Sequence, residues 1–178
     1  GSSSDSRIMH SAGEILDEFG VAHEDQIISA HRTPTRLDEY AKHAEKSGFK
    51  VIIAGAGGAA HLPGMIASHT IIPVIGVPIM VYNDKQQKKS ESHKFSAFGG
   101  LDSLLSISEM PSGSPVVTVG VNKASNAAIY ALKILANESS TIKKKLRTHK
   151  IKQHKFVLKE SDDLKKMGLR KFVKKKFK

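Results

Sequence analysis

The segment KVIIAGAGG at residues 50–58 most constrains the fold, because it is an apolar run without polar alternation that ends in glycines. A strand that is apolar on both faces is typical of a parallel sheet with helices on both sides. Two later segments, IPVIGVPI at 72–79 and SGSPVVTVGV at 112–121, have the same character, and EDQIISA at 24–30 predicts a shorter strand. The chain is therefore predicted to contain a parallel sheet.

Helical patterns alternate with these strands. Residues 6–19 carry apolar side chains at helical spacing and stop at Gly20, which predicts an amphipathic helix with a glycine cap. A second helix is predicted from Thr33 as N-cap, with Pro34 at its first position and Gly48 beyond its end. Further helices are predicted within 61–70 and 126–137. This alternation indicates a three-layer α/β/α fold with a doubly wound parallel sheet, flavodoxin-like or Rossmann-like. Such a domain normally begins with a strand, so we expect one ahead of Gly1.

The positive charge of the chain is concentrated in its last quarter. The net charge is +11, but residues 137–178 contribute +12 and the remainder −1. We predict a catalytic domain over 1–136, with a lysine-rich insertion at 81–97, and a basic helical extension over 137–178. The extension could contact RNA, an anionic membrane surface or an acidic partner. A solvated helix is favoured and nucleic-acid binding is not expected, because no stacking aromatic residues or base-reading motif accompany the lysines.

Composition removes several classes of function. The chain has no cysteine, which excludes disulfides, thiolate metal ligands and a cysteine nucleophile. No apolar run reaches about 18 residues and no leader pattern is present, so we expect a cytoplasmic protein without a membrane partner. The nine histidines form no recognised metal-binding spacing, and no metal or cofactor is predicted.

Polar and glycine-rich segments follow the predicted strands, at the edge where open parallel sheets bind ligands. They are SAHRTP at 29–34, GAGGAAHLPG at 55–64 and FGGLDSL at 98–104, with GSSSD at 1–5 as a fourth candidate. Ser29, His31 and Arg32 share one turn before a helix, which suits an anion and a group that titrates near neutral pH. His31 could equally cap a loop, with Arg32 paired to a surface carboxylate.

The glycine-rich segment fits G-x-G-x-x-A through Gly55, Gly57 and Ala60. A dinucleotide site also needs an acidic residue about 20 positions on, and no Asp or Glu lies between Lys46 and Asn83. Backbone that approaches a ligand closely is the better interpretation. His61 could join that pocket or be held by backbone in a tight loop, and GSSSD could be a cloning scar or a phosphate-binding turn.

Taken together, GSSSD, SAHRTP, AGAGGAAHLPGM, PVIGVP and GLDSLLSISEMPSGSPV resemble the phosphoribosylaminoimidazole carboxylases, specifically the N5-carboxyaminoimidazole ribonucleotide mutase type of purine biosynthesis. The resemblance covers residues 1 to about 136, apart from 81–97. It implies that GSSSD is a substrate-binding turn, and that the family's first strand precedes Gly1. It also implies cofactor-free carboxylate transfer between N5-carboxyaminoimidazole ribonucleotide and 4-carboxyaminoimidazole ribonucleotide, and a homo-octamer.

Site residues follow from the same resemblance, position by position. His31 would be the general acid and base. The ribose 5′-phosphate would lie against Ser2, Ser4 and Arg32, with Asp5 on the ribose hydroxyls and Ser29 near the base. Backbone around the released carbon dioxide would complete the substrate-binding set, which comprises Gly1, Ser2, Ser4, Asp5, Ser29, Arg32, Ala54, Gly55, Gly57, Gly58 and His61.

Two features depart from the family pattern. Lysine-rich residues 81–97 replace a short link, and VNKASNAA at 121–128 looks more like the form fused behind an ATP-dependent carboxylase, which makes a fused or partner carboxylase domain possible. Two other functions stay open: a direct aminoimidazole ribonucleotide carboxylase that uses carbon dioxide, and an inactive scaffold whose basic tail binds nucleic acid.

Overall fold

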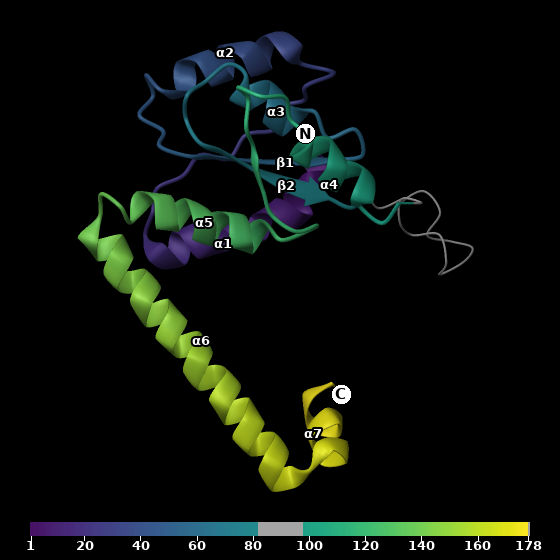
Figure 1. Cartoon of the computed structure of the whole chain (residues 1–178), viewed down its shortest axis with the longest axis vertical. Helices are drawn as coiled ribbons and strands as arrows, with labels where there is room; N and C mark the ends of the chain where they lie inside the picture. The colour runs from purple at the N-terminus through teal and green to yellow at the C-terminus, as the bar shows by residue number, and fades with distance from the viewer. Residues whose placement is uncertain (82–97, 178) are drawn as a thin grey trace. The chain divides into compact units, whose positions relative to one another are not determined.

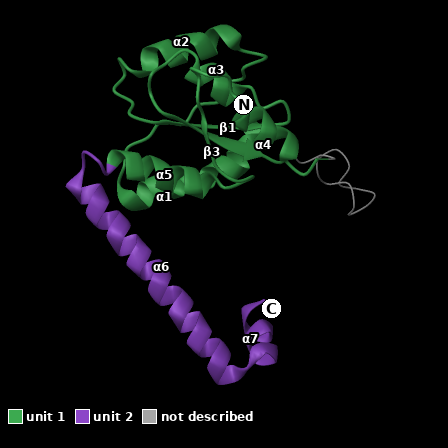
Figure 2. Cartoon of the chain, in the orientation of Figure 1, with its two compact units in different colours: residues 1–135 green, residues 136–178 purple. Residues whose placement is uncertain are grey.

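The structure is a computed structural model that describes residues 1–81 and 98–177. Two compact units make up the chain, residues 1–135 and residues 136–178 (Figure 2). The assignment of function to 1–136 and of an extension to 137–178 stays a prediction. The lysine-rich stretch predicted as an insertion lies almost wholly outside the described residues.

A parallel sheet forms the middle layer of the first unit. Its strands are β1 (Ile52–Gly57), β2 (Val74–Ile79) and β3 (Val117–Thr118), in the order β1-β2-β3. The β1–β2 register runs from Ile52 opposite Val74 to Gly57 opposite Ile79. All six residues of β2 are buried, as expected of a strand with helices on both sides. The predicted parallel sheet is confirmed, although β3 is only two residues long.

Helices cover both faces of this sheet (Figure 1). On one face lie α1 (Ser6–Phe19) and α5 (Ala124–Leu135), and on the other lie α2 (Pro34–Ala44), α3 (Leu62–Ala67) and α4 (Leu101–Ser108). The short 3₁₀ helix η1 (Ser3–Asp5) leads into α1. The three-layer α/β/α fold is confirmed, including the glycine cap of α1, because Gly20 is left-handed with φ 66°.

The hydrophobic core explains which strand residues face which layer. Ile52, Ala54 and Ala56 of β1 belong to a buried cluster with residues of α2 and α3 and with Ile107 of α4. Gly55 faces the opposite layer, where Met9 of α1 packs against it. Small residues on both faces let helices approach β1 closely.

One predicted strand is not present. Residues 24–30 are irregular in the structure, although their sequence predicts a strand. A strand needs a neighbouring strand to accept and donate its backbone hydrogen bonds. No described strand lies beside this segment, since the described sheet contains only β1, β2 and β3. The prediction of a strand at 24–30 was therefore wrong for the described structure, because this segment has no neighbouring strand with which to pair.

The second unit is helical. It contains α6 (Ser140–Met167) and α7 (Leu169–Lys176), with no buried residue in either helix. Ser139 caps α6 by accepting a hydrogen bond from the Ile142 amide at 3.3 Å. Within this unit the Lys176 ammonium pairs with the Glu160 carboxylate and lies 5.0 Å from the centroid of the Phe156 ring. No described helix is long and apolar enough to cross a bilayer.

Candidate active site

The predicted site residues meet at the carboxyl end of β1. They come from the η1 turn, from the turn between residues 29 and 33, and from the segment that follows β1. Ligands of open parallel sheets bind at this edge because the turns after neighbouring strands converge there. Backbone and side-chain hydrogen bonds join these three segments, as described below.

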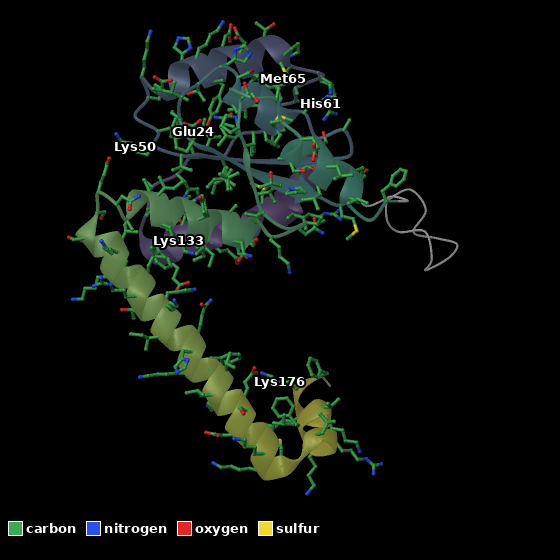
Figure 3. The ribbon with its side chains drawn as sticks, viewed as in Figure 1. Glu24, Lys50, His61, Met65, Lys133 and Lys176 are labelled. Carbon is green, nitrogen blue, oxygen red and sulfur yellow. The ribbon has the colours of Figure 1, made fainter. Side chains whose placement is uncertain are left out.

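His31 and His61 form a direct pair although 30 positions separate them in the sequence. The Nε2 atom of His31 lies 2.8 Å from the Nδ1 atom of His61, and the ring planes are at 76°. His61 is positioned as the residue immediately before α3 (Figure 3). In a neutral pair one nitrogen donates and the other accepts, so the two exposed rings share one proton. The Nδ1 atom of His31 takes no part in this bond.

Arg32 links the 29–33 turn to the start of the chain. Its Nε atom donates to the Ser29 hydroxyl at 3.2 Å, and its Nη2 atom donates to the Gly1 carbonyl oxygen at 3.2 Å. The Arg32 amide also donates to the Ser29 hydroxyl, at 3.3 Å. The guanidinium therefore lies between both segments and places a fixed positive charge at the site.

Asp5 organises the GSSSD turn from inside. Its carboxylate accepts a hydrogen bond from the Ser2 amide at 2.9 Å and lies 3.0 Å from the Gly1 nitrogen. Asp5 is only 9% exposed, although aspartate side chains are rarely buried. Hydrogen bonds from backbone nitrogen atoms hold its carboxylate in this buried position. The Ser2 and Ser4 hydroxyls lie 2.6 Å apart at the surface of this turn. The turn is a folded part of the domain, which is inconsistent with a cloning scar.

Glycines along β1 bring the backbone close to its neighbours. A Cβ atom on Gly57 would lie 2.8 Å from the Ile79 carbonyl oxygen, and one on Gly55 would lie 2.5 Å from the Met9 sulfur. Gly58 is left-handed with φ 63°, which turns the chain toward His61. Ala54 is buried behind this surface at 4% exposure. Gly55 and Gly57 thus bring the backbone of β1 close to neighbouring protein atoms, and its close approach to a ligand stays a prediction.

Other residues near this edge were not predicted from the sequence. Asn122 has φ 58°, its amide donates to the Pro78 carbonyl at 2.8 Å, and its side-chain oxygen accepts from the Met80 amide at 3.0 Å. Ser103 is fully buried and donates to the Ile79 carbonyl at 3.1 Å. These two side chains hold the end of β2. The only sequence signal was that Asn tolerates left-handed backbone better than most residues.

The candidate segment FGGLDSL contains a glycine turn followed by the start of a helix. Gly99 and Gly100 are left-handed, with φ 57° and 88°, and Leu101 begins α4. A Cβ on Gly100 would lie 2.6 Å from Val121 Cγ1, so the turn requires glycine. Across residues 1–81 and 98–177, no three His, Asp or Glu side chains are grouped as metal ligands would be.

The fold and the site define an α/β protein with a histidine pair and an arginine-serine turn at the carboxyl ends of its strands. A family model described as AIR carboxylase matches residues 1–155. The chain belongs to the AIR carboxylase family, as its motifs predicted.

The names of proteins with similar sequences are consistent with this family. The chain is 51% identical over 173 residues to the N5-carboxyaminoimidazole ribonucleotide mutase of Pyrococcus horikoshii, covering 97% of this chain and 90% of that protein. It is 48% identical over 176 residues to the mutase of Thermotoga maritima, covering 99% and 95%. The chloroplastic phosphoribosylaminoimidazole carboxylase of Vigna aconitifolia is 45% identical over 174 residues, covering 98% of this chain and 29% of that protein. The crystal structure of Treponema denticola PurE shares the fold, with a TM-score of 0.73 at 23% identity and 95% coverage of both chains.

Proposed function

We propose that this protein interconverts N5-carboxyaminoimidazole ribonucleotide and 4-carboxyaminoimidazole ribonucleotide. The observation that carries the proposal is the His31–His61 pair beside the Arg32–Ser29–Gly1 contacts. A proton-transfer group and a fixed cation next to each other suit a phosphorylated substrate that gains one proton and loses another. Relatives named as mutases at about half identity support the same reaction.

The reaction needs two proton transfers, and the enzyme neither gains nor loses a proton over the full cycle. The bond between the exocyclic nitrogen and the carboxylate breaks, carbon dioxide is released, and His31 gives a proton to that nitrogen. Ring carbon C4 then attacks the carbon dioxide, and His31 removes the C4 proton to restore the aromatic ring. A histidine can perform both steps near neutral pH. His61 can pass a proton to or from Nε2 of His31 while Nδ1 of His31 exchanges with the substrate.

The remaining groups would bind and enclose the substrate. Arg32 with Ser2 and Ser4 would hold the 5′-phosphate, and Asp5 would accept from ribose hydroxyls while Ser29 lies near the base. Backbone from Gly55 to Gly58, with Ala54 behind it, would confine carbon dioxide and exclude water between the two steps. In this role the absence of side chains at the glycines leaves room for the small intermediate.

The test is the ultraviolet absorbance change when the protein is mixed with 4-carboxyaminoimidazole ribonucleotide. The wild type should convert it, and His31→Asn should lose activity by about 10²–10⁴-fold, the usual contribution of a general acid or base. His43→Asn is the matched control, because His43 is also exposed but lies on α2, where its Nδ1 atom contacts the Glu39 carbonyl oxygen. Equal loss in both variants would contradict the role of His31.

The alternative function is a direct carboxylase, and the relatives that are named as carboxylases support it. Supplying aminoimidazole ribonucleotide with bicarbonate separates the two, since only the carboxylase turns over this mixture rapidly. We further propose a cytoplasmic homo-octamer, which light scattering on the purified protein would test directly. A fused or partner ATP-dependent carboxylase is proposed as the source of the N5-carboxylated substrate.

A further inference from the structure

The last part of the second unit combines dense positive charge with apolar side chains. Residues 164–177 contain seven Lys or Arg and no Asp or Glu. They comprise the last turn of α6, Gly168 and the whole of α7. Gly168 has a φ of 73°, a backbone conformation that favours glycine, and it separates the two helices. As a result, α7 is a distinct and strongly cationic helix.

Apolar residues of α7 form an exposed row. Leu169, Val173 and Phe177, the last directly after the helix, recur at every fourth position, and side chains at this spacing share one side of a helix. They are 69%, 45% and 76% exposed. The row is roughly 12 Å long at a rise of about 1.5 Å per residue. We call these three residues the α7 stripe. A contiguous apolar row in water, unlike a scattered single residue, indicates an interaction surface.

Neighbouring residues of α7 pack against α6 and leave the α7 stripe uncovered. The Lys176 ammonium pairs with the Glu160 carboxylate and lies 5.0 Å from the centroid of the Phe156 ring (Figure 3). Phe172 lines a cavity of about 240 Å³ together with Phe156 and Met167 of α6. These contacts hold α7 on α6 through one side of the helix, while the α7 stripe stays open to solvent.

The positive charge of α7 is mostly uncompensated. Lys176 is paired with Glu160, but the other four cations of the helix form no ion pair within the described part of the chain; they are Arg170, Lys171, Lys174 and Lys175. Arg170 and Lys174 each follow a stripe residue by one position, so they lie beside the stripe. Long basic side chains there can keep their charged ends in water while their stems border the apolar row.

A partner for this surface must offer anionic groups next to an apolar layer. An anionic lipid surface has this arrangement everywhere, because charged headgroups lie directly above the acyl chains. Nucleic acid would match the charge only, since Leu169 and Val173 are aliphatic and cannot stack on bases as aromatic side chains do. An acidic protein would need a groove of the same length with carboxylates in register. The combination therefore favours a lipid surface.

We propose that α7 binds anionic lipid surfaces. The α7 stripe enters the boundary between headgroups and acyl chains, and the four unpaired cations contact the headgroups. Because α7 is short, this contact is peripheral and reversible. The expectation of no membrane partner was drawn from the lack of a spanning segment and of a leader, and a helix that lies in the interface needs neither. This inference goes beyond the proposed function and does not depend on it.

The test is sedimentation of the full chain with vesicles of phosphatidylcholine, either pure or containing about 30% phosphatidylserine. Binding to the mixed vesicles should be at least about tenfold tighter than binding to the neutral ones. Raising the salt concentration should weaken it, because salt screens the attraction between exposed charges. Equal binding to both kinds of vesicle would contradict the role of the cations.

A first pair of variants tests the α7 stripe. Leu169→Gln combined with Val173→Gln keeps the charge and uses a residue that is compatible with helix, so circular dichroism should be unchanged. Affinity for the mixed vesicles should fall at least about tenfold, because two apolar side chains no longer leave water. The matched control is Ile151→Gln combined with Leu158→Gln on α6, at 54% and 53% exposure, which should change affinity less than about twofold.

A second pair tests the cations beside the stripe. Arg170→Gln combined with Lys174→Gln should weaken binding at least about tenfold. Lys152→Gln combined with Lys155→Gln removes the same charge from α6, where both side chains are also exposed, and should weaken binding less than about threefold. Equal losses from these two variants, with no loss from the stripe variant, would show general attraction of a basic chain and overturn the proposal.

The remaining outcomes assign the surface to another kind of partner. If the chain does not sediment with the mixed vesicles, the proposal is wrong. A shift of single-stranded RNA, or of polyglutamate, that is lost in the Arg170→Gln and Lys174→Gln variant would then point to a nucleic acid or an acidic protein. No measurement here follows turnover of a ribonucleotide, so failure of the proposed function would leave this result unaffected.

Discussion

At the scale of single residues, the 2.8 Å contact between His31 and His61 is the feature that most directly bears on chemistry. His61→Phe removes this hydrogen bond but keeps a ring of similar size before α3. One hydrogen bond contributes about 0.5–1.5 kcal/mol, so we expect kcat to fall by up to about tenfold. KM should change little, because His61 acts through His31.

The pH profile of kcat distinguishes positioning from packing in this variant. Loss of the proton partner should move the limbs of the profile, whereas a packing defect would lower kcat at every pH alike. An unchanged profile together with reduced thermal stability would assign His61 a structural role.

Two glycines of β1 allow a matched comparison. A Cβ on Gly57 meets the Ile79 carbonyl oxygen, which is backbone within β2 and cannot move without disturbing the sheet. A Cβ on Gly55 meets the Met9 sulfur, the far part of a flexible side chain. Gly57→Ala should lower the free energy of unfolding by about 1–3 kcal/mol, and Gly55→Ala by less. Urea unfolding of both variants measures this difference, and the reverse order would contradict the argument.

At the scale of elements, Asp38 of α2 pairs with Lys42 on the same helix and contacts His69, which follows α3. The Asp38 carboxylate lies 2.8 Å from the Lys42 ammonium and 3.3 Å from the His69 Nδ1 atom. The hydrogen bond from Lys42 lowers the pKa of Asp38 below its ordinary value of 3.8. The stabilisation from this carboxylate is therefore present above pH 3.8 and is lost as the pH falls through the lower pKa of the folded state.

Thermal unfolding between pH 2 and 6 tests this linkage. The wild type should lose more stability on acidification than Asp38→Asn, whose amide cannot titrate. The difference should be small because the pair is on the surface, where solvent screens it. Curves for the two proteins that stay parallel across this range would show that the pair does not contribute.

Patterns in the sequence predicted the elements whose signals are local. The apolar run at Ile52–Gly57 and the glycine stop at Gly20 were both confirmed. The strand expected at 24–30 was wrong for the described chain, because pairing depends on a neighbour that the local pattern does not contain. The strand predicted within 112–121 is present at the predicted position but is shorter than predicted, since only Val117 and Thr118 pair with β2.

In the candidate site, too, local groupings could be predicted from the sequence and contacts between distant residues could not. Residues that share a turn, such as Ser29 and Arg32, could be grouped from the sequence. The bond between His31 and His61 could not, because it depends on how the turn after β1 approaches a turn 30 residues earlier. Asn122 was missed for a similar reason, since its contacts with β2 span more than 40 residues.

At the scale of the whole molecule, the two units should differ in protection. The first unit buries every residue of β2, whereas α6 and α7 have no buried residue among those described. Amides of α6 should therefore exchange with solvent faster than those of β2, by at least about tenfold, because local opening of an unpacked helix costs little. Hydrogen exchange followed by mass spectrometry measures both in one sample.

Slow exchange in α6 would have a definite meaning. Ile151, Phe156, Val157 and Leu158 are 53–61% exposed in the single chain. Protection equal to that of β2 would show that another molecule covers these side chains in solution. Dilution should then restore fast exchange, since association depends on concentration.

Arg32 has a consequence for the thermodynamics of ligand binding. Long flexible side chains lose rotamer freedom when they are immobilised, and that loss opposes association. Here the Arg32 guanidinium is already held by the Ser29 hydroxyl and the Gly1 carbonyl before any ligand arrives. The entropic cost of ordering this cation is met during folding, so an anion that binds beside it encounters a rigid receptor. Its affinity should then depend mainly on charge and desolvation, and little on side-chain ordering.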